Sequence, residues 1–112
     1  MKNKLMIVWS SSEKEVAKKL ILMYGSVILE RKYWDEATII VWGPSAKLLA
    51  EDEELQKQFE VVKKSGVKFF ACVVCADSYG VSDTLRELGI TLIHTGEMLT
   101  EALQSDVKVI TF

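Results

Sequence analysis

The chain of 112 residues is long enough for one domain with a single core, and its 49% hydrophobic and 27% charged residues are ordinary for a globular protein. A formal net charge of −2 offers no basic face to a phosphate backbone, which argues against direct nucleic-acid binding. No apolar run approaches the ~20 residues of a membrane span, and the short run Leu5 to Trp9 is no secretory signal. We therefore expect a cytoplasmic protein with reduced thiols.

The first predicted strand is Lys4–Trp9, an apolar run without the alternation of a half-exposed strand, which indicates cover on both faces. Ser12 and Glu15 then fit a capping box at the start of a helix. Apolar residues at three- and four-residue steps predict the buried face of this helix: Val16, Leu20, Met23 and Val27, with Tyr24 and Ile28 as further candidates.

A second buried strand is expected at Ala37–Trp42, which is rich in β-branched residues. Pro44 suits the first turn of a helix, and a short helix is predicted over 47–50. A longer helix begins near Asp52 and is stopped by Gly66. Its buried face is predicted to contain Leu55, Phe59 and Val62.

Three further strands complete the pattern, at Val67–Val73, Ile90–Ile93 and Val107–Phe112. Helices are expected between them at Ser82–Leu88 and at Glu97–Gln104, the latter capped by Thr95. Helices between successive strands imply right-handed crossovers and a parallel sheet. The predicted fold is therefore α/β: a single-domain three-layer α/β/α sandwich with a five-stranded parallel sheet.

Binding sites in such folds form outside the carboxyl ends of the strands. Both cysteines and the only histidine follow predicted strands, so Cys72, Cys75 and His94 are expected on one rim of the sheet. A thiol at a strand end that faces the start of the next helix has a lowered pKa and favours the thiolate. The alternative is that Cys72 is a small buried packing residue.

The spacing Cys72-Val-Val-Cys75 suits thiol–disulfide exchange or half of a metal site. Structural zinc needs four ligands, and the chain has only one such motif and one histidine, so we expect neither a metal nor a cofactor. Two β-branched valines between the thiols suit a strand better than the first turn of a helix.

Other polar residues on this rim are candidates for supporting roles. His94 is suited to activating a thiolate or moving a proton. Each of the six candidates listed below also has a structural alternative, as a hydrogen-bonded loop, turn or capping residue. The supporting candidates are His94, Asp77, Ser78, Tyr79, Ser10 and Ser11.

The segment 70–80, Phe-Ala-Cys-Val-Val-Cys-Ala-Asp-Ser-Tyr-Gly, with Ser65-Gly66-Val67-Lys68 before it, resembles the DsrE/DsrF-like (DsrEFH, TusBCD) family. In that family a cysteine closes the third strand and a glycine follows at the distance of Gly80. The run 85–90, Leu-Arg-Glu-Leu-Gly-Ile, and the ending Lys108–Phe112 are also similar. The resemblance covers essentially the whole chain and implies one DsrE-like domain over residues 1–112.

The resemblance implies a homo-oligomer, a trimer or hexamer, that relays sulfur as a cysteine persulfide between protein donors and acceptors. Cys72 matches the sulfur-accepting cysteine, which implies a sulfurtransferase-like carrier. Cys75 departs from the relay pattern, and its expected role is to resolve a persulfide as an internal disulfide. Two alternatives stay open: a C-x-x-C dithiol redox protein, and a non-enzymatic oligomeric binding module whose cysteines are structural.

Overall fold

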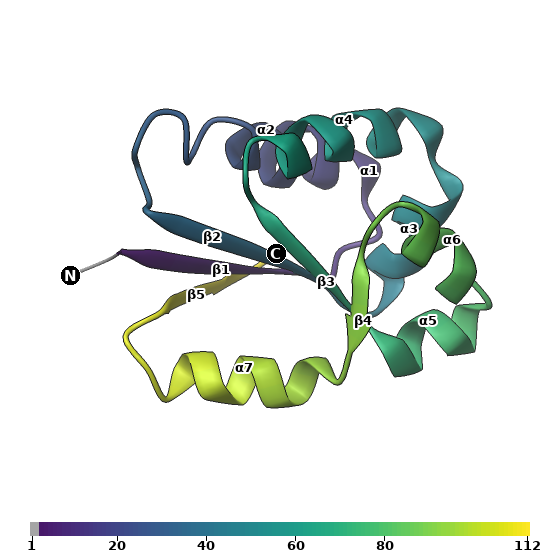
Figure 1. Cartoon of the computed structure of the whole chain (residues 1–112). Coiled ribbons are helices and arrows are strands. Elements are labelled where there is room, and N and C mark those ends of the chain that lie inside the picture. The colour runs from purple at the N-terminus through teal and green to yellow at the C-terminus, as the bar shows by residue number, and fades with distance from the viewer. Residues whose placement is uncertain (1–2) are drawn as a thin grey trace.

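A five-stranded, all-parallel sheet forms the centre of the protein, with the strand order β4-β3-β2-β1-β5 (Figure 1). The computed structural model describes residues 3–112, so Met1 and Lys2 of the predicted domain lie outside the described residues. The predicted α/β class and parallel sheet are confirmed. The strands are β1 (Lys4–Trp9), β2 (Glu36–Val41), β3 (Lys68–Cys72), β4 (Thr91–Ile93) and β5 (Lys108–Thr111).

Helices flank the sheet on both faces, but unequally. In Figure 1, α1, α2 and α4 lie over one face and α7 lies over the other, while α3, α5 and α6 gather toward the carboxyl ends of the strands. A π-helical segment, Ala17–Ile21, joins α1 to α2. The helices are α1 (Lys14–Val16), α2 (Leu22–Gly25), α3 (Pro44–Glu51), α4 (Glu53–Lys64), α5 (Val73–Tyr79), α6 (Ser82–Glu87) and α7 (Thr95–Leu103).

The larger of two apolar clusters lies between the sheet and the helices from α1 to α6. Alternate strand residues such as Ile7, Ile39 and Phe69 point into it, as the two-residue period of a strand requires. The smaller cluster lies under α7, where Met6 and Ile40 contact Ala102. The single helix α7 therefore covers the second face of the sheet, which has fewer helices than the first.

The helix after β1 presents a different face from the predicted one. Leu20 and Met23 are exposed, whereas Ala17 and Ile21 are completely buried. The predicted and the observed sets of residues both have helical spacing, and the observed set, along the π-helical segment, is the one packed into the larger apolar cluster. The predicted capping box is also wrong, because the N-cap is Glu13 and its side chain makes no capping bond.

The chain enters a helix directly from β3, one residue before the predicted end of that strand. The expected strand Val67–Val73 ends at Cys72, and α5 begins at the next residue. The expectation that Val73 and Val74 favour a strand is therefore wrong. Their β-branched side chains lower helix propensity by less than ~1 kcal/mol each, which capping and packing of the helix readily outweigh.

Candidate thiol site

Cys72 is at once the last residue of β3 and the N-cap of α5. Its backbone is extended, with φ −68° and ψ 116°, and its Sγ accepts a hydrogen bond from the backbone N–H of Cys75 at 3.3 Å. A sulfur atom thus takes the position that a serine or aspartate oxygen usually occupies at the start of a helix. A negative charge on this sulfur is stabilised by the helix amides that point toward it.

Cys72 forms part of the wall of an open pocket of about 510 Å³ at the carboxyl ends of β2, β3 and β4. The residue is only 7% exposed, yet it borders this space. The parallel pairing of Cys72 with Ile93 brings the start of α7 beside it. The pocket is lined by Trp42, Cys72, Val74 and residues 94–97.

The surroundings of Cys72 lower the pKa of its thiol. Burial raises this pKa, but hydrogen bonds to the sulfur more than compensate for it. The largest of these effects come from the Cys75 thiol and the Cys75 N–H, and the nearby Thr95 hydroxyl and Val74 N–H lower the pKa to a smaller extent. Hydrogen bonds of this kind favour the charged sulfur over the neutral thiol.

The pKa of the Cys75 thiol moves in the opposite direction. Burial raises it, the neighbouring Cys72 raises it further, and the Gly43 N–H opposes both effects only in part. Of the two thiols, Cys72 is therefore the more acidic. Two thiols within one helical turn therefore differ in acidity.

The predicted supporting residues are divided between the pocket and other places. His94 is exposed and lines the pocket with Cys72. The carboxylate of Asp77 accepts a hydrogen bond from Ser82. Ser78 and Tyr79 are exposed on α5 and do not line the pocket.

The two candidate serines after β1 make structural hydrogen bonds. The Ser10 hydroxyl donates to the carbonyl of Phe112 at 2.9 Å. The Ser11 backbone N–H donates to the same carbonyl at 3.2 Å, and its hydroxyl accepts from the N–H of Glu13. These bonds join the loop after β1 to the end of β5, and neither serine lines the pocket of Cys72.

Five residues of this pocket were not among the predicted site residues: Trp42, Val74, Thr95, Gly96 and Glu97. The prediction of Thr95 as a helix cap is wrong, because His94 is the N-cap and Thr95 is the first residue within α7. Val74 became a pocket residue only because α5 begins immediately after Cys72. The position of Thr95 two residues after a predicted strand is the one signal in the sequence that pointed to this rim.

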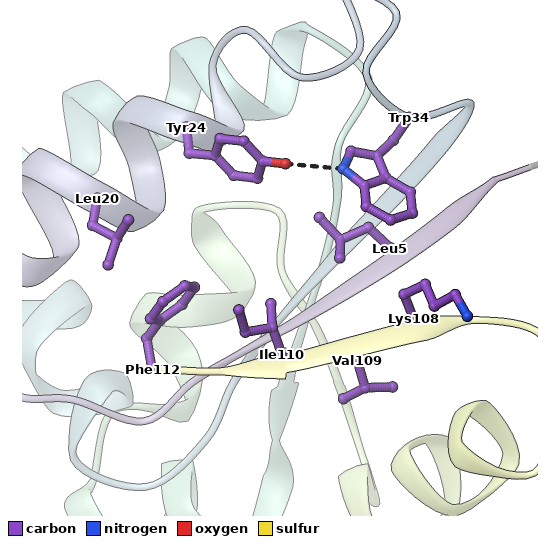
Figure 2. A pocket seen from close by; sticks show the side chains of 8 residues that line it. All are labelled: Leu5, Leu20, Tyr24, Trp34, Lys108, Val109, Ile110 and Phe112. Carbon is purple, nitrogen blue, oxygen red and sulfur yellow. Dashed lines mark hydrogen bonds between the residues drawn. The ribbon is translucent and has the colours of Figure 1, made fainter.

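A second pocket, of about 360 Å³, runs along β5 and is almost wholly apolar. Figure 2 shows Ile110 and Phe112 facing Leu20 and Tyr24 across it. Trp34 donates a hydrogen bond to the Tyr24 hydroxyl at 2.9 Å. None of its lining residues is a thiol or a carboxylate. The lining consists of Leu5, Leu20, Tyr24, Trp34, Lys108, Val109, Ile110 and Phe112.

Two negative findings apply to residues 3–112. Within that range, no three histidine, cysteine, aspartate or glutamate side chains converge as a metal site would require. None of the helices described there is long and apolar enough to cross a membrane.

The sequence of the chain also matches a known protein family. The profile of the DsrE/DsrF-like family matches residues 6–112. The chain belongs to the DsrE/DsrF-like family. The resemblance noted from the segment 70–80 is therefore confirmed, and membership implies a role of the sulfur-relay type.

Solved structures show the same fold. A conserved protein of unknown function from Bacteroides thetaiotaomicron, BT1422, is 33% identical with a TM-score of 0.94, over 98% of this chain and 95% of the other. The ychN protein of E. coli is 17% identical with a TM-score of 0.72, over 100% of both chains. MTH1491 of Methanobacterium thermoautotrophicum, also of unknown function, is 15% identical with a TM-score of 0.73, over 98% and 99%. No curated protein matches the chain.

The opposite pKa shifts lead to a prediction about alkylation. Iodoacetamide at neutral pH is expected to label Cys72 before Cys75, and the rate at Cys72 should level off at a lower pH. Cys75→Ala removes the thiol donor and should move the Cys72 profile to higher pH, whereas Cys75→Ser keeps a donor and should move it less. Peptide mapping of the label against pH checks this. Preferential labelling of Cys75 would contradict the assignment.

Proposed function

We propose that this protein is a sulfur carrier, in which the Cys72 thiolate accepts a sulfane sulfur and passes it on to a partner protein. The observation that carries the proposal is the Cys72 sulfur itself, which caps α5 and borders an open pocket. A helix amide holds the sulfur at 3.3 Å, and the lowered pKa favours the nucleophilic form. Membership of a family whose members act in sulfur-relay complexes adds support.

The transfer requires two displacements at sulfur. The Cys72 thiolate attacks the outer sulfur of a donor persulfide, so that a new S–S bond forms as the donor's S–S bond breaks and its electron pair leaves on the donor thiolate. The proton stays on the terminal sulfur. A thiolate of the acceptor then attacks that terminal sulfur, and Cys72 leaves as a thiolate. No external oxidant or reductant is needed, and the stabilised Cys72 thiolate is a good leaving group in the second step.

Cys75 determines how long the loaded state lasts. As a thiolate it would attack the Cys72 sulfur, release the terminal sulfur as hydrosulfide and leave a Cys72–Cys75 disulfide that a thiol reductant must reopen. Its raised pKa keeps it protonated and slows this attack. We therefore assign Cys75 mainly to hydrogen bonding with Cys72, with resolution of the persulfide as a slower reaction.

A partner protein has an apolar surface to contact beside the thiol. Val74 is 63% exposed and lines the same pocket, as does Trp42. Exposed apolar groups around a reactive group are typical of protein interaction sites. Such a contact would bring a cysteine of the donor or acceptor into the pocket, and the reduced cytoplasm would suit this exchange.

The second candidate function is dithiol redox chemistry. It is favoured by one observation, namely that Cys72 and Cys75 lie one turn apart at the start of α5 with mutually shifted pKa values. That arrangement suits a thiol pair in which the first cysteine attacks a substrate and the second resolves the mixed disulfide. The two functions differ in what is left on Cys72: an additional sulfur or a disulfide.

Incubation with glutathione persulfide is expected to add the mass of one sulfur atom to Cys72, and Cys72→Ser should abolish the adduct. Cys75→Ser should keep the adduct, with a longer lifetime because resolution is lost. Intact-mass spectrometry followed by peptide mapping makes the measurement. Rapid formation of a Cys72–Cys75 disulfide without a detectable adduct would favour the redox function. Thiols that stay unreactive in the folded protein would favour the structural alternative.

We also propose that the protein is a homo-oligomer, which the free edge of β5 and the apolar pocket beside it favour. Ile110 is 45% exposed and lines this pocket. It lies on β5, which is an edge strand of the described sheet. An exposed sheet edge with apolar side chains is unfavourable in an isolated monomer and suits a contact between copies.

Ile110→Lys is expected to reduce the mass of the assembly toward that of the monomer, because a charge would be buried in an apolar contact. Multi-angle light scattering after size-exclusion chromatography measures the mass. Val61→Lys is the matched control, since Val61 is also exposed but lies on α4, outside this pocket. A monomeric wild-type protein, or equal effects of both changes, would contradict this assignment.

A further inference from the structure

Thr95 has a buried hydroxyl that the fold leaves without a partner. The residue is 1% exposed. Among the buried side-chain oxygen and nitrogen atoms of residues 3–112, its Oγ1 alone makes no hydrogen bond. A threonine at the start of a helix normally caps it, but here His94 is the N-cap. An unpaired buried hydroxyl destabilises a protein, so its retention needs an explanation.

The Thr95 hydroxyl lies in the same region of the protein as the Cys72 sulfur. Cys72 pairs with Ile93 across β3 and β4, and the chain reaches Thr95 two residues later. Thr95 and Cys72 line the same pocket. The hydroxyl is close enough to lower the pKa of Cys72, although it makes no regular hydrogen bond in the resting geometry.

We propose that the Thr95 hydroxyl is a hydrogen-bond donor reserved for the negatively charged sulfur on Cys72. In the unloaded protein this sulfur is the thiolate that forms when Cys72 loses its proton. In the loaded protein, a state that rests on the proposed carrier function, it is the terminal sulfur of the persulfide after that sulfur has released its proton to solvent. The donor would keep that sulfur pointing toward the open pocket, where an acceptor reaches it.

The chemistry explains why the hydroxyl is unpaired. A neutral thiol is a weak acceptor, whereas a thiolate or persulfide anion is a strong one. A donor that gains its partner only when charge develops stabilises the charged states and leaves the neutral thiol unaffected. The backbone amide of Cys75 already serves the sulfur in the resting state, so Thr95 supplies a second donor from a different element.

Other groups lie near the same sulfur, and their effects on its pKa must be distinguished from that of Thr95. Cys75 donates from α5, while His94 and Glu97 line the pocket from the start of α7. The two α7 side chains are exposed, so solvent and salt screen their influence. The threonine hydroxyl is buried and uncharged at every pH of interest, which makes its effect independent of salt.

The test compares Thr95→Val with Thr95→Ser. Valine keeps the shape and removes the donor, so the thiolate absorbance of Cys72 in the ultraviolet should titrate at higher pH. At a fixed pH below the midpoint, the thiolate fraction should fall by about tenfold. Alkylation by iodoacetamide should slow by only about threefold, because the remaining thiolate is intrinsically more nucleophilic. Serine keeps the hydroxyl and should restore both values toward the wild type, at low and high salt alike.

Thr100→Val is the matched control. Thr100 lies on the same helix, but its hydroxyl is exposed and donates to the carbonyl of Gly96 at 2.8 Å. It should leave the titration unchanged. Thr95→Val should not lower the urea midpoint of unfolding, because it removes an unpaired polar group from the interior. The proposal would be overturned if Thr95→Val titrated like the wild type. It would also be overturned if Thr95→Ser showed the same shift as Thr95→Val.

Persulfide loading of the same variants separates this inference from the proposed function. If the wild type takes up no sulfur from glutathione persulfide but Thr95→Val still shifts the titration, the carrier function fails and the role of Thr95 at the thiolate stands. If the wild type is loaded and Thr95→Val neither shifts the titration nor shortens the lifetime of the adduct, the carrier function stands and the role of Thr95 fails.

Discussion

The hydrogen bond from the Cys75 amide to the Cys72 sulfur is the contact on which the rest of the site depends. It joins the end of a central, buried strand to the start of α5, and the sulfur itself caps the helix. Because the strand lies between β2 and β4, the backbone of Cys72 is fixed by pairing on both sides. The helix amide then holds the sulfur, with its charge stabilised, at the border of an open pocket.

The unequal cover of the sheet explains why that pocket exists. Most helices pack into the larger cluster on one face, and α7 alone supports the smaller one. Trp42 and Cys72, at the ends of β2 and β3, consequently border open space instead of another helix. The second pocket has a different origin, since it follows the edge strand β5 and is apolar along its length. One region of the surface thus suits chemistry and the other suits contact between proteins.

The comparisons define the family but assign no donor or acceptor. BT1422 shares the fold almost completely at 33% identity and is itself of unknown function. The other two structures, at 17% and 15% identity, show the fold alone. A fold of this type hosts many activities, so the assignment must rest on the site. Here the site offers an asymmetric thiol pair, a spare hydroxyl donor and an apolar rim.

The order of strands and helices, the parallel sheet and the position of Cys72 at a strand end followed from the sequence alone. Lys4–Trp9 was predicted with the observed bounds, and Leu55, Phe59 and Val62 are buried as expected. These features depend on local hydrophobic periodicity and on chain connectivity, which a sequence displays directly.

Tertiary contacts decided the details on which the chemistry depends. Two overlapping apolar faces were available to the helix after β1, and packing against the sheet selected the one with Ala17 and Ile21. The start of α5 at Val73 ran against the local β-propensity of two valines, because the cap at Cys72 and the burial of Ala76 outweigh it. Thr95 came to lie beside Cys72 only through the pairing of β3 with β4. Composition and spacing describe neighbours along the chain, whereas the environment of a sulfur atom is set by residues that are distant in sequence.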